Sequence, residues 1–326
     1  MFGSRYRPAP RMTDTLLIAE LITVRDWLRF ATSQFTRAQL TFGHGTSTAL
    51  DEAAFLILVT LHLPIDTIEP WLDARLTRPE RLALQGIIEK RVVTRKPAAY
   101  LLNAAWIGPH RFFVDERVIV PRSYIGELLN GGLAGVIDDP GSVGRVLDLC
   151  TGSGCLAILA ALQFQGADVD AVELSGDAIK VAERNVADYR LTDRVRVLQG
   201  DLFVPVDAQR YDLIIANPPY VTAAAVAAFP PEFRAEPRMA HLGGDDGMDI
   251  VRRILADAGK SLTAHGMLVI EIGFGRDILE NEFGHLPFLW LDTAESDGEV
   301  FALPAAALQE SRKPKAAAKA GKSRKR

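Results

Sequence analysis

The residues best suited to chemistry stand together after a short apolar segment. They are Asn217, Pro218, Pro219 and Tyr220, and the preceding residues 212–216 are typical of a buried strand. The Asn217 side-chain oxygen and the Pro218 carbonyl can each accept one hydrogen of the same amide nitrogen, which fixes this weak nucleophile and raises its electron density. The prolines restrict the backbone, and Tyr220 offers a flat wall for packing. We call Asn217 to Tyr220 the NPPY segment; its alternative reading is a plain proline-rich turn.

A glycine-rich turn provides a candidate ligand site. It follows the strand-like residues 146–149, precedes a helix-like segment, and consists of Cys150, Thr151, Gly152, Ser153 and Gly154. Small residues let a ligand approach the backbone closely, and the free amides of a helix N-terminus can face that ligand. The spacing from Gly152 through Gly154 to Ala157 also fits the fingerprint of dinucleotide-binding proteins, so the turn alone does not identify the ligand.

Acidic residues at the expected strand ends favour S-adenosylmethionine over a dinucleotide. Asp148 ends the strand before the turn and can accept from the ammonium group of this cofactor, although a helix cap is its alternative role. Glu173 follows the second strand and can accept from both ribose hydroxyls. Asp201 and Leu202 follow the third strand, where a carboxylate can accept from the adenine amine and a leucine can pack on the ring; a plain turn is the alternative.

The order of elements predicts an α/β fold that brings these residues to one edge. Strand-like and helix-like segments alternate from residue 145 to 272, which indicates a doubly wound, mostly parallel, seven-stranded sheet. The last strand candidates, 288–291 and 299–303, have no helix between them and predict an antiparallel edge. In such sheets ligands bind at the carboxyl ends of the strands.

The chain is predicted to divide into a helical domain, a β-hairpin linker, a catalytic domain and a basic tail, which cover residues 1–105, 106–121, 122–308 and 309–326. Apolar residues recur with helical spacing from Val24 to Phe35, and Thr77 with Glu80 forms the capping box of another helix. In the linker, residues 112–114 and 118–120 are predicted as strands around the polar turn 115–117.

These motifs resemble the HemK-like protein glutamine methyltransferases from about residue 20 to 305. The resemblance includes residues outside the motifs, namely Tyr100, Val120-Pro121-Arg122, Glu127, Glu236-Pro237 and Gly243-Gly244-Asp245-Asp246-Gly247. It implies a Rossmann-like methyltransferase fold, S-adenosylmethionine as the cofactor, and transfer of a methyl group to the side-chain amide nitrogen of a protein glutamine. It also implies that Cys150 to Gly154, Glu173, Leu202 and Asn217 bind the cofactor, while the NPPY segment holds the glutamine.

Three features favour the branch of this family that acts on ribosomal protein L3. They are residues 42–46, residues 60–64, and Cys150, which stands where the release-factor branch usually has glycine. A release-factor glutamine stays an alternative substrate. Adenine in nucleic acid is another, because its exocyclic amine poses the same chemical problem, although no separate target-recognition domain is evident. Outside enzymes, the alternative is a cofactor-binding ribosome-assembly factor without catalysis.

Composition is that of a globular protein. The 326 residues are 48% hydrophobic and 24% charged, enough for two units. Apolar runs are far shorter than the ~20 residues of a membrane span, and no secretory signal is recognised, so a cytoplasmic location is expected.

Cys150 and Cys155 flank a turn, which argues against a disulfide or metal site. The six histidines lack metal-ligand spacing, and residues 243–249 are predicted to cap the next helix rather than bind metal.

Charge is unevenly distributed. The chain has a net charge of −4, yet residues 311–326 contain eight Lys or Arg and no acid. Such a block predicts a disordered arm that touches RNA phosphates weakly, with a simple solubilising tail as the alternative.

Overall fold

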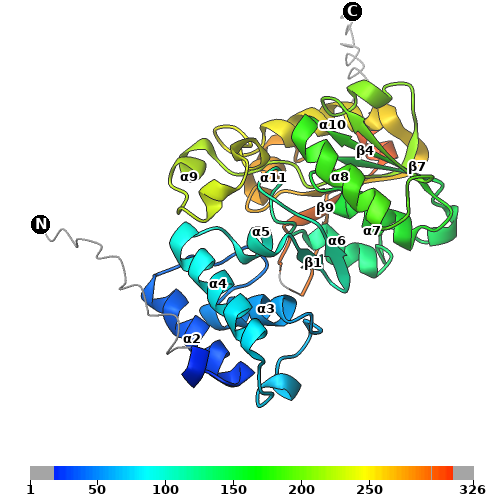
Figure 1. The fold of residues 1–326 in the computed structure, drawn as a ribbon. Coiled ribbons are helices and arrows are strands. Elements are labelled where there is room, and N and C mark those ends of the chain that lie inside the picture. Colours follow the sequence, from blue (N-terminus) through cyan, green and yellow to red (C-terminus); the bar gives the residue numbers. More distant parts are fainter. Residues whose placement is uncertain (1–17, 295, 311–326) are drawn as a thin grey trace, which may run out of the picture. The chain divides into compact units, whose positions relative to one another are not determined.

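The computed structural model describes residues 18–294 and 296–310, which divide into two compact units (Figure 1). The helical unit contains the described residues up to Ala105, together with Val114–Glu116 and Phe229–Glu236. The sheet unit contains Trp106–Phe113, Arg117–Ala228 and the described residues from Pro237 onward. Residues 311–326, the part of the basic tail that the sequence predicts to contact RNA, lie outside the described residues, whereas residues 309 and 310 belong to the last helix.

The helical unit forms where the capping and apolar patterns predict helices. Its elements are α2 (Val24–Arg37), α3 (Ala49–Thr60), η1 (Glu69–Trp71), α4 (Arg78–Thr94) and α5 (Ala98–Leu102). Thr77 and Glu80 form the predicted capping box at the start of α4. Trp27 and Phe35 of α2 are fully buried in the same core as Leu56 of α3. Within this core, the buried Arg91 of α4 pairs with the buried Glu52 at 2.6 Å.

The sheet unit contains the predicted seven-stranded sheet, in the order β5-β4-β3-β6-β7-β9-β8. Its strands are β3 (Arg145–Leu149), β4 (Asp168–Glu173), β5 (Val195–Gln199), β6 (Tyr211–Ala216), β7 (Leu262–Glu271), β8 (Leu289–Leu291) and β9 (Val300–Pro304). Strands β3 to β7 pair in parallel, whereas β9 pairs antiparallel with both β7 and β8. The predicted fold class and its antiparallel edge are therefore confirmed.

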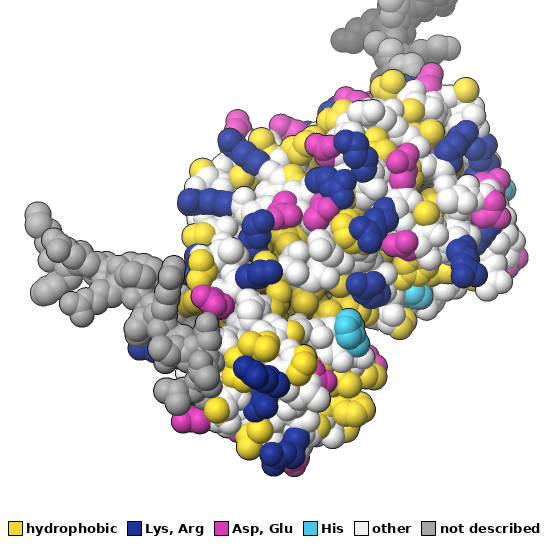
Figure 2. Space-filling view, in the orientation of Figure 1, with side chains coloured by type: hydrophobic (Ala, Val, Ile, Leu, Met, Phe, Trp, Pro, Cys, Tyr) yellow, Lys and Arg dark blue, Asp and Glu magenta, His cyan; other side chains and the backbone are white. Residues whose placement is uncertain are grey.

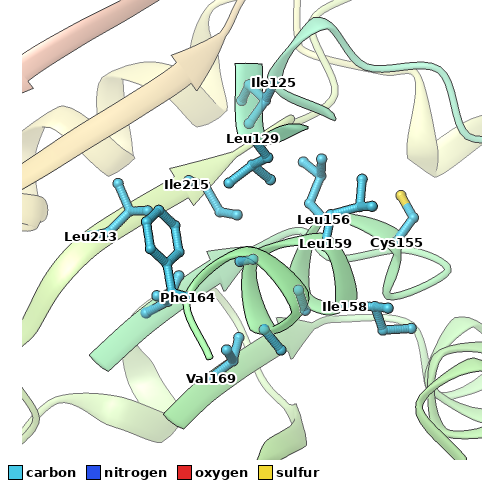
Figure 3. Packing of buried hydrophobic residues seen from close by; sticks show 14 of the residues in the cluster. Ile125, Leu129, Cys155, Leu156, Ile158, Leu159, Phe164, Val169, Leu213 and Ile215 are labelled. Atoms are coloured by element: carbon cyan, nitrogen blue, oxygen red, sulfur yellow. The ribbon is translucent and has the colours of Figure 1, made fainter. Parts of the chain in front are cut away.

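Alternation of side chains along the strands gives the sheet two apolar faces. Leu213 and Ile215 of β6 lie in one core, and Ile214 lies in the other. The first face packs against α6 (Tyr124–Asn130), α7 (Cys155–Gln163) and α8 (Gly176–Asp188), and the second against α10 (Asp249–Ser261), α11 (Arg276–Glu282) and α12 (Ala305–Glu310). Figure 3 shows the first core, where Leu156 and Leu159 of α7 pack with residues of β6.

The β-hairpin lies earlier in the chain than the sequence predicts. Its strands are β1 (Ala105–Ile107) and β2 (His110–Phe112), joined through Gly108, whose φ of +53° suits a tight turn. Residues 113–120, part of which was predicted as two strands, do not pair in this way. The reason is visible at Phe113, because its N–H donates to the Asn185 side chain at 2.8 Å and its carbonyl accepts from that side chain at 3.0 Å. These backbone groups are therefore not available to a ladder.

The surface of the described residues mixes both signs of charge. Figure 2 shows acidic and basic side chains interspersed over one face. Among the described residues, no helix combines the length and apolar character that crossing a membrane requires.

Candidate active site

The predicted site residues follow the carboxyl ends of four neighbouring strands. In the sheet register, Leu149 of β3 pairs with Val172 of β4 on one side and with Ala216 of β6 on the other. Cys150 and Asn217 are the next residues after this second pair. The glycine-rich turn and the NPPY segment therefore leave the sheet side by side, where ligands of doubly wound sheets bind.

Glu173 closes the glycine-rich turn. Its Oε2 atom accepts from the backbone N–H of Gly152 at 2.9 Å, and its Oε1 atom accepts from the N–H of Ser175 at 2.9 Å. The turn is also held by the Thr151 N–H, which donates to the carbonyl of Val172 at 3.1 Å. Each carboxylate oxygen can accept a second hydrogen bond, so Glu173 keeps the capacity to bind two hydroxyls.

Asp148 caps the helix that follows the turn. Its side chain is completely buried, and its Oδ2 atom accepts from the Thr151 hydroxyl and from the Ala157 N–H, the latter at 3.0 Å. The helix-cap role, which was the less favoured alternative at the sequence level, is therefore present. The Oδ1 atom is buried without a hydrogen-bond partner among the described residues. Burial raises the pKa of Asp148 to about 7, because the charged form loses its hydration.

Two non-glycine residues of the predicted cofactor site have left-handed backbone conformations. They are Cys150, with φ of +60°, and Leu202, with φ of +50°. This conformation costs about 1–3 kcal/mol and concentrates at functional sites. The positive φ also explains in physical terms why glycine suits position 150.

Asp201 does not take part in this backbone geometry. Its half-exposed side chain pairs with Arg253 of α10 at 2.7 Å.

The NPPY segment is held at both ends. At its first residue, the Asn217 Nδ2 atom donates to the backbone carbonyl of Arg122 at 3.4 Å, which leaves the Asn217 Oδ1 atom to accept from a ligand. At its last residue, the Tyr220 hydroxyl donates to Oε1 of the buried Glu271 at 3.1 Å. The Tyr220 ring also packs closely on Gly273, where an added Cβ would lie 2.8 Å from Cε2. Asn217 and Tyr220 therefore have fixed orientations.

A glycine loop braces the NPPY segment from outside, a role that sequence reasoning missed. The Gly243 N–H donates to the Val221 carbonyl at 2.9 Å, and the Ala223 N–H donates to the Gly244 carbonyl at 3.0 Å. The sequence predicts only that this loop caps the next helix, and the Gly243 carbonyl does accept from the N–H of Asp249, the first residue of α10, at 3.0 Å. The clustered glycines were the available signal, since two backbones can approach closely only without side chains.

Glu271 is the second functional candidate that sequence reasoning missed. Glu271 is the last residue of β7, so an acid directly after an apolar run was the available signal. Burial raises the pKa of Glu271 to about 6.

The segment after the NPPY region, Phe229–Glu236, is held inside the helical unit. Glu232 is fully buried, accepts from the Thr41 N–H at 3.1 Å and pairs with Arg95 at 2.6 Å. The Phe233 ring contacts the buried His44 ring with centroids 4.2 Å apart. Residues 42–46, part of the branch resemblance, thus hold the chain that follows the NPPY segment, and His44 has the structural role that the sequence predicts.

Comparison with known proteins gives the class of the protein. The family described as the methyltransferase small domain matches residues 133–229, which include the glycine-rich turn and the NPPY segment, and together with the following relatives this match shows a methyltransferase. The ribosomal protein uL3 glutamine methyltransferase of Burkholderia pseudomallei is 55% identical over 293 residues, 88% of this chain and 95% of that protein. Its namesake from Bradyrhizobium diazoefficiens is 52% identical over 311 residues, 94% and 97% of the two chains.

The chain therefore belongs to the family of ribosomal protein uL3 glutamine methyltransferases. Among solved structures, a methyltransferase from Pyrococcus furiosus is similar at 13% identity and a TM-score of 0.45, over 71% of this chain and 99% of that one.

Proposed function

We propose that this protein transfers a methyl group from S-adenosylmethionine to the side-chain amide nitrogen (N5) of a glutamine in ribosomal protein uL3. The observation that carries the proposal is the pairing of Leu149 with Ala216, which starts a cofactor-type turn and an amide-binding segment at adjacent strand ends. The names of relatives that are more than half identical supply the substrate.

The residues proposed to bind the cofactor are those that the sequence predicts, and Glu173 and Asp148 among them have oxygens that fit its polar groups. The full set is Asp148, Cys150, Thr151, Gly152, Ser153, Gly154, Glu173, Asp201, Leu202 and Asn217. When bound, S-adenosylmethionine supplies a methyl group activated by its sulfonium charge. Glu173 offers two oxygens to the ribose, and the buried, unpartnered Oδ1 atom of Asp148 offers an acceptor for an ammonium group.

The NPPY segment is proposed to position the glutamine amide. Asn217 Oδ1 and the Pro218 carbonyl each accept one amide hydrogen, while Tyr220 packs on the amide plane and Pro219 keeps the backbone rigid. With both molecules bound, the nitrogen lone pair would form a bond to the methyl carbon as the carbon–sulfur bond breaks and its electron pair stays on sulfur. The nitrogen would then lose one proton to water. No strong base is required, because orientation alone can contribute about 7–11 kcal/mol in favourable cases.

Substrate selection is assigned to the helical unit, since the NPPY segment can recognise only a planar amide. The exchange of this unit for that of a release-factor enzyme is therefore expected to abolish activity on uL3 and to preserve cofactor binding. Residues 229–236 must be exchanged together with it, because they are part of the same unit. A ribosomal protein substrate also favours a cytoplasmic location.

The test is a side-by-side assay of the intact protein. Purified uL3 and a release factor are each incubated with S-adenosylmethionine, and mass spectrometry locates any added methyl group. We expect methylation of a uL3 glutamine, none with Asn217→Ala, and little change after removal of residues 311–326. Methylation of the release factor alone would show that the substrate is wrong but the chemistry right. Tight cofactor binding without transfer to either protein, or transfer to adenine, would overturn the proposal.

A further inference from the structure

We infer that Glu271 is a positioning residue for methyl transfer, which acts by holding Tyr220 of the NPPY segment and the segment Ser123-Tyr124 in one fixed arrangement. The inference rests on the proposed function. Glu271 has no role in that mechanism, and it is 1% exposed at the end of β7.

The place of Glu271 in the sheet brings it to the reacting region. Ile270 of β7 pairs in parallel with Ala216 of β6, so Glu271 and Asn217 are the next residues on two adjacent strands. The glutamine-binding segment begins at Asn217. A carboxylate at position 271 therefore stands beside the segment without belonging to it.

Glu271 joins three parts of the chain that are far apart in sequence. Oε1 accepts from the Tyr220 hydroxyl at 3.1 Å, while Oε2 accepts from the Ser123 hydroxyl at 2.6 Å and from the Tyr124 N–H at 2.9 Å. Arg122, next to Ser123, provides the carbonyl that accepts from the Asn217 side chain. The carboxylate therefore fixes Tyr220 directly and supports, through residues 122–124, the partner that orients Asn217.

Burial makes this arrangement stiff. A buried carboxylate left without donors is strongly destabilised, so Glu271 keeps its hydrogen bonds in preference to other geometries. A glutamine amide bound against Tyr220 then packs on a ring with a fixed orientation. We call the hydrogen bonds that Glu271 accepts from Tyr220, Ser123 and Tyr124 the clamp. Because positioning supplies much of the rate in this mechanism, loss of the clamp is expected to lower kcat more than it weakens the binding of uL3.

The same unit contains a matched control pair. Asp170 of β4 is 5% exposed and accepts from the hydroxyl of the buried Tyr211 at 2.6 Å, which is the same tyrosine–carboxylate hydrogen bond. It pairs with Arg196 near the start of β5, whereas the proposed site lies beyond the other ends of the strands. Tyr211→Phe thus reports what loss of a buried carboxylate–tyrosine bond does to the fold alone, and Asp170→Asn reports that loss together with the loss of the ion pairs to Arg145 and Arg196.

The experiment compares Glu271→Gln, Tyr220→Phe, their double variant and Ser123→Ala with this control pair, using uL3 and S-adenosylmethionine. We expect Glu271→Gln to lower kcat about tenfold or more, with KM for uL3 and Kd for the cofactor changed less than about threefold. The kcat of the double variant is expected to be no more than about twofold below that of the less active single variant, because both changes break the same clamp. Asp170→Asn is expected to keep kcat within about twofold of the parent.

Amide hydrogen exchange provides a readout that needs no substrate. We expect faster exchange at Tyr124 and Val221 in Glu271→Gln than in the parent or in Asp170→Asn. If Glu271→Gln does not fold, Ser123→Ala removes one donor and is expected to show the same changes at smaller size. Unchanged kcat, multiplicative effects in the double variant, or equal loss in Asp170→Asn would overturn the clamp. Failure of the parent to methylate glutamine would overturn the proposed function instead, and the exchange comparison would still decide about the clamp.

Discussion

Gly243 lies so close to Pro219 that a Cβ atom on residue 243 would be 2.6 Å from the Pro219 carbonyl oxygen. The same atom would lie 2.7 Å from the Cα atom of Tyr220. Two main chains therefore pack on each other with no side chain between them. The NPPY segment takes its shape from this neighbouring loop as well as from its own prolines.

Gly243→Ala is therefore expected to displace the NPPY segment. The added methyl group has no flexible neighbour to push aside, so a loss of about 1–3 kcal/mol in the free energy of unfolding is expected, together with reduced kcat. Chemical denaturation and a methyl-transfer assay measure the two effects. Gly166→Ala is the control, since a Cβ there meets no atom within 4 Å. Equal behaviour of the two variants would show that the close contact is unimportant.

Asn217→Ala is expected to abolish transfer and to leave most of the fold intact. It removes the oxygen proposed to accept from the glutamine amide, and among the described residues the Asn217 side chain makes one hydrogen bond, to the Arg122 carbonyl at 3.4 Å. Turnover and the thermal melting curve should be measured on the same preparation. Near-normal turnover would remove Asn217 from the catalytic role.

Glu173→Ala is expected to weaken binding of S-adenosylmethionine by about 1.5–3 kcal/mol, the range for hydrogen bonds to a charged group. The structure adds a second cause, because Glu173 also fixes the turn through the Gly152 N–H. Isothermal titration calorimetry gives the dissociation constant. An unchanged constant would contradict both roles.

Asp148→Asn is expected to stabilise the ligand-free protein above neutral pH and to weaken cofactor binding. Because the folded-state pKa is raised from 3.8 to about 7, the folded protein binds this proton more tightly than the unfolded chain does. The group's stabilising contribution is therefore complete below pH 3.8 and is lost as the pH rises to about 7. An asparagine oxygen can still accept from Thr151 and Ala157 without a buried charge.

The melting temperature of Asp148→Asn minus that of the parent should therefore increase between pH 5 and pH 8 (~2–4 °C for each 1 kcal/mol). A difference that does not depend on pH would show that the buried carboxyl group does not titrate in this range.

Much of the fold could be predicted because its signals are local. The C-terminal ends of β3 and β6, at Leu149 and Ala216, agree with the sequence prediction, since each strand is a short, mostly apolar run followed by turn residues. The hairpin was misplaced because Phe113 bonds to Asn185, a partner 72 residues away that no local pattern indicates. The same reason hid Glu271, whose contact with Tyr124 spans 147 residues.

The candidate site was predictable to a different degree. Residue types and order indicated which strand ends carry chemistry, and the sheet register brings Cys150 and Asn217 together as that order requires. What surrounds them could not be predicted, because the brace at Gly243 depends on backbone approach, which leaves no periodic pattern in the sequence. Asp201 was predicted as a cofactor residue from strand order alone. Its ion pair with Arg253 is a tertiary contact that strand order does not indicate.

The discontinuous make-up of the helical unit has a consequence for biosynthesis. Arg95 and the loop at His44 are translated long before Glu232 and Phe233, the residues that complete their packing. A nascent chain ending anywhere before residue 236 thus lacks part of this unit, although its helices are already made. Domains usually fold in order as they leave the ribosome, N-terminal first. Here the last part of the N-terminal unit is synthesised only after more than half of the sheet unit, so we expect the two units to complete their folding together rather than in succession.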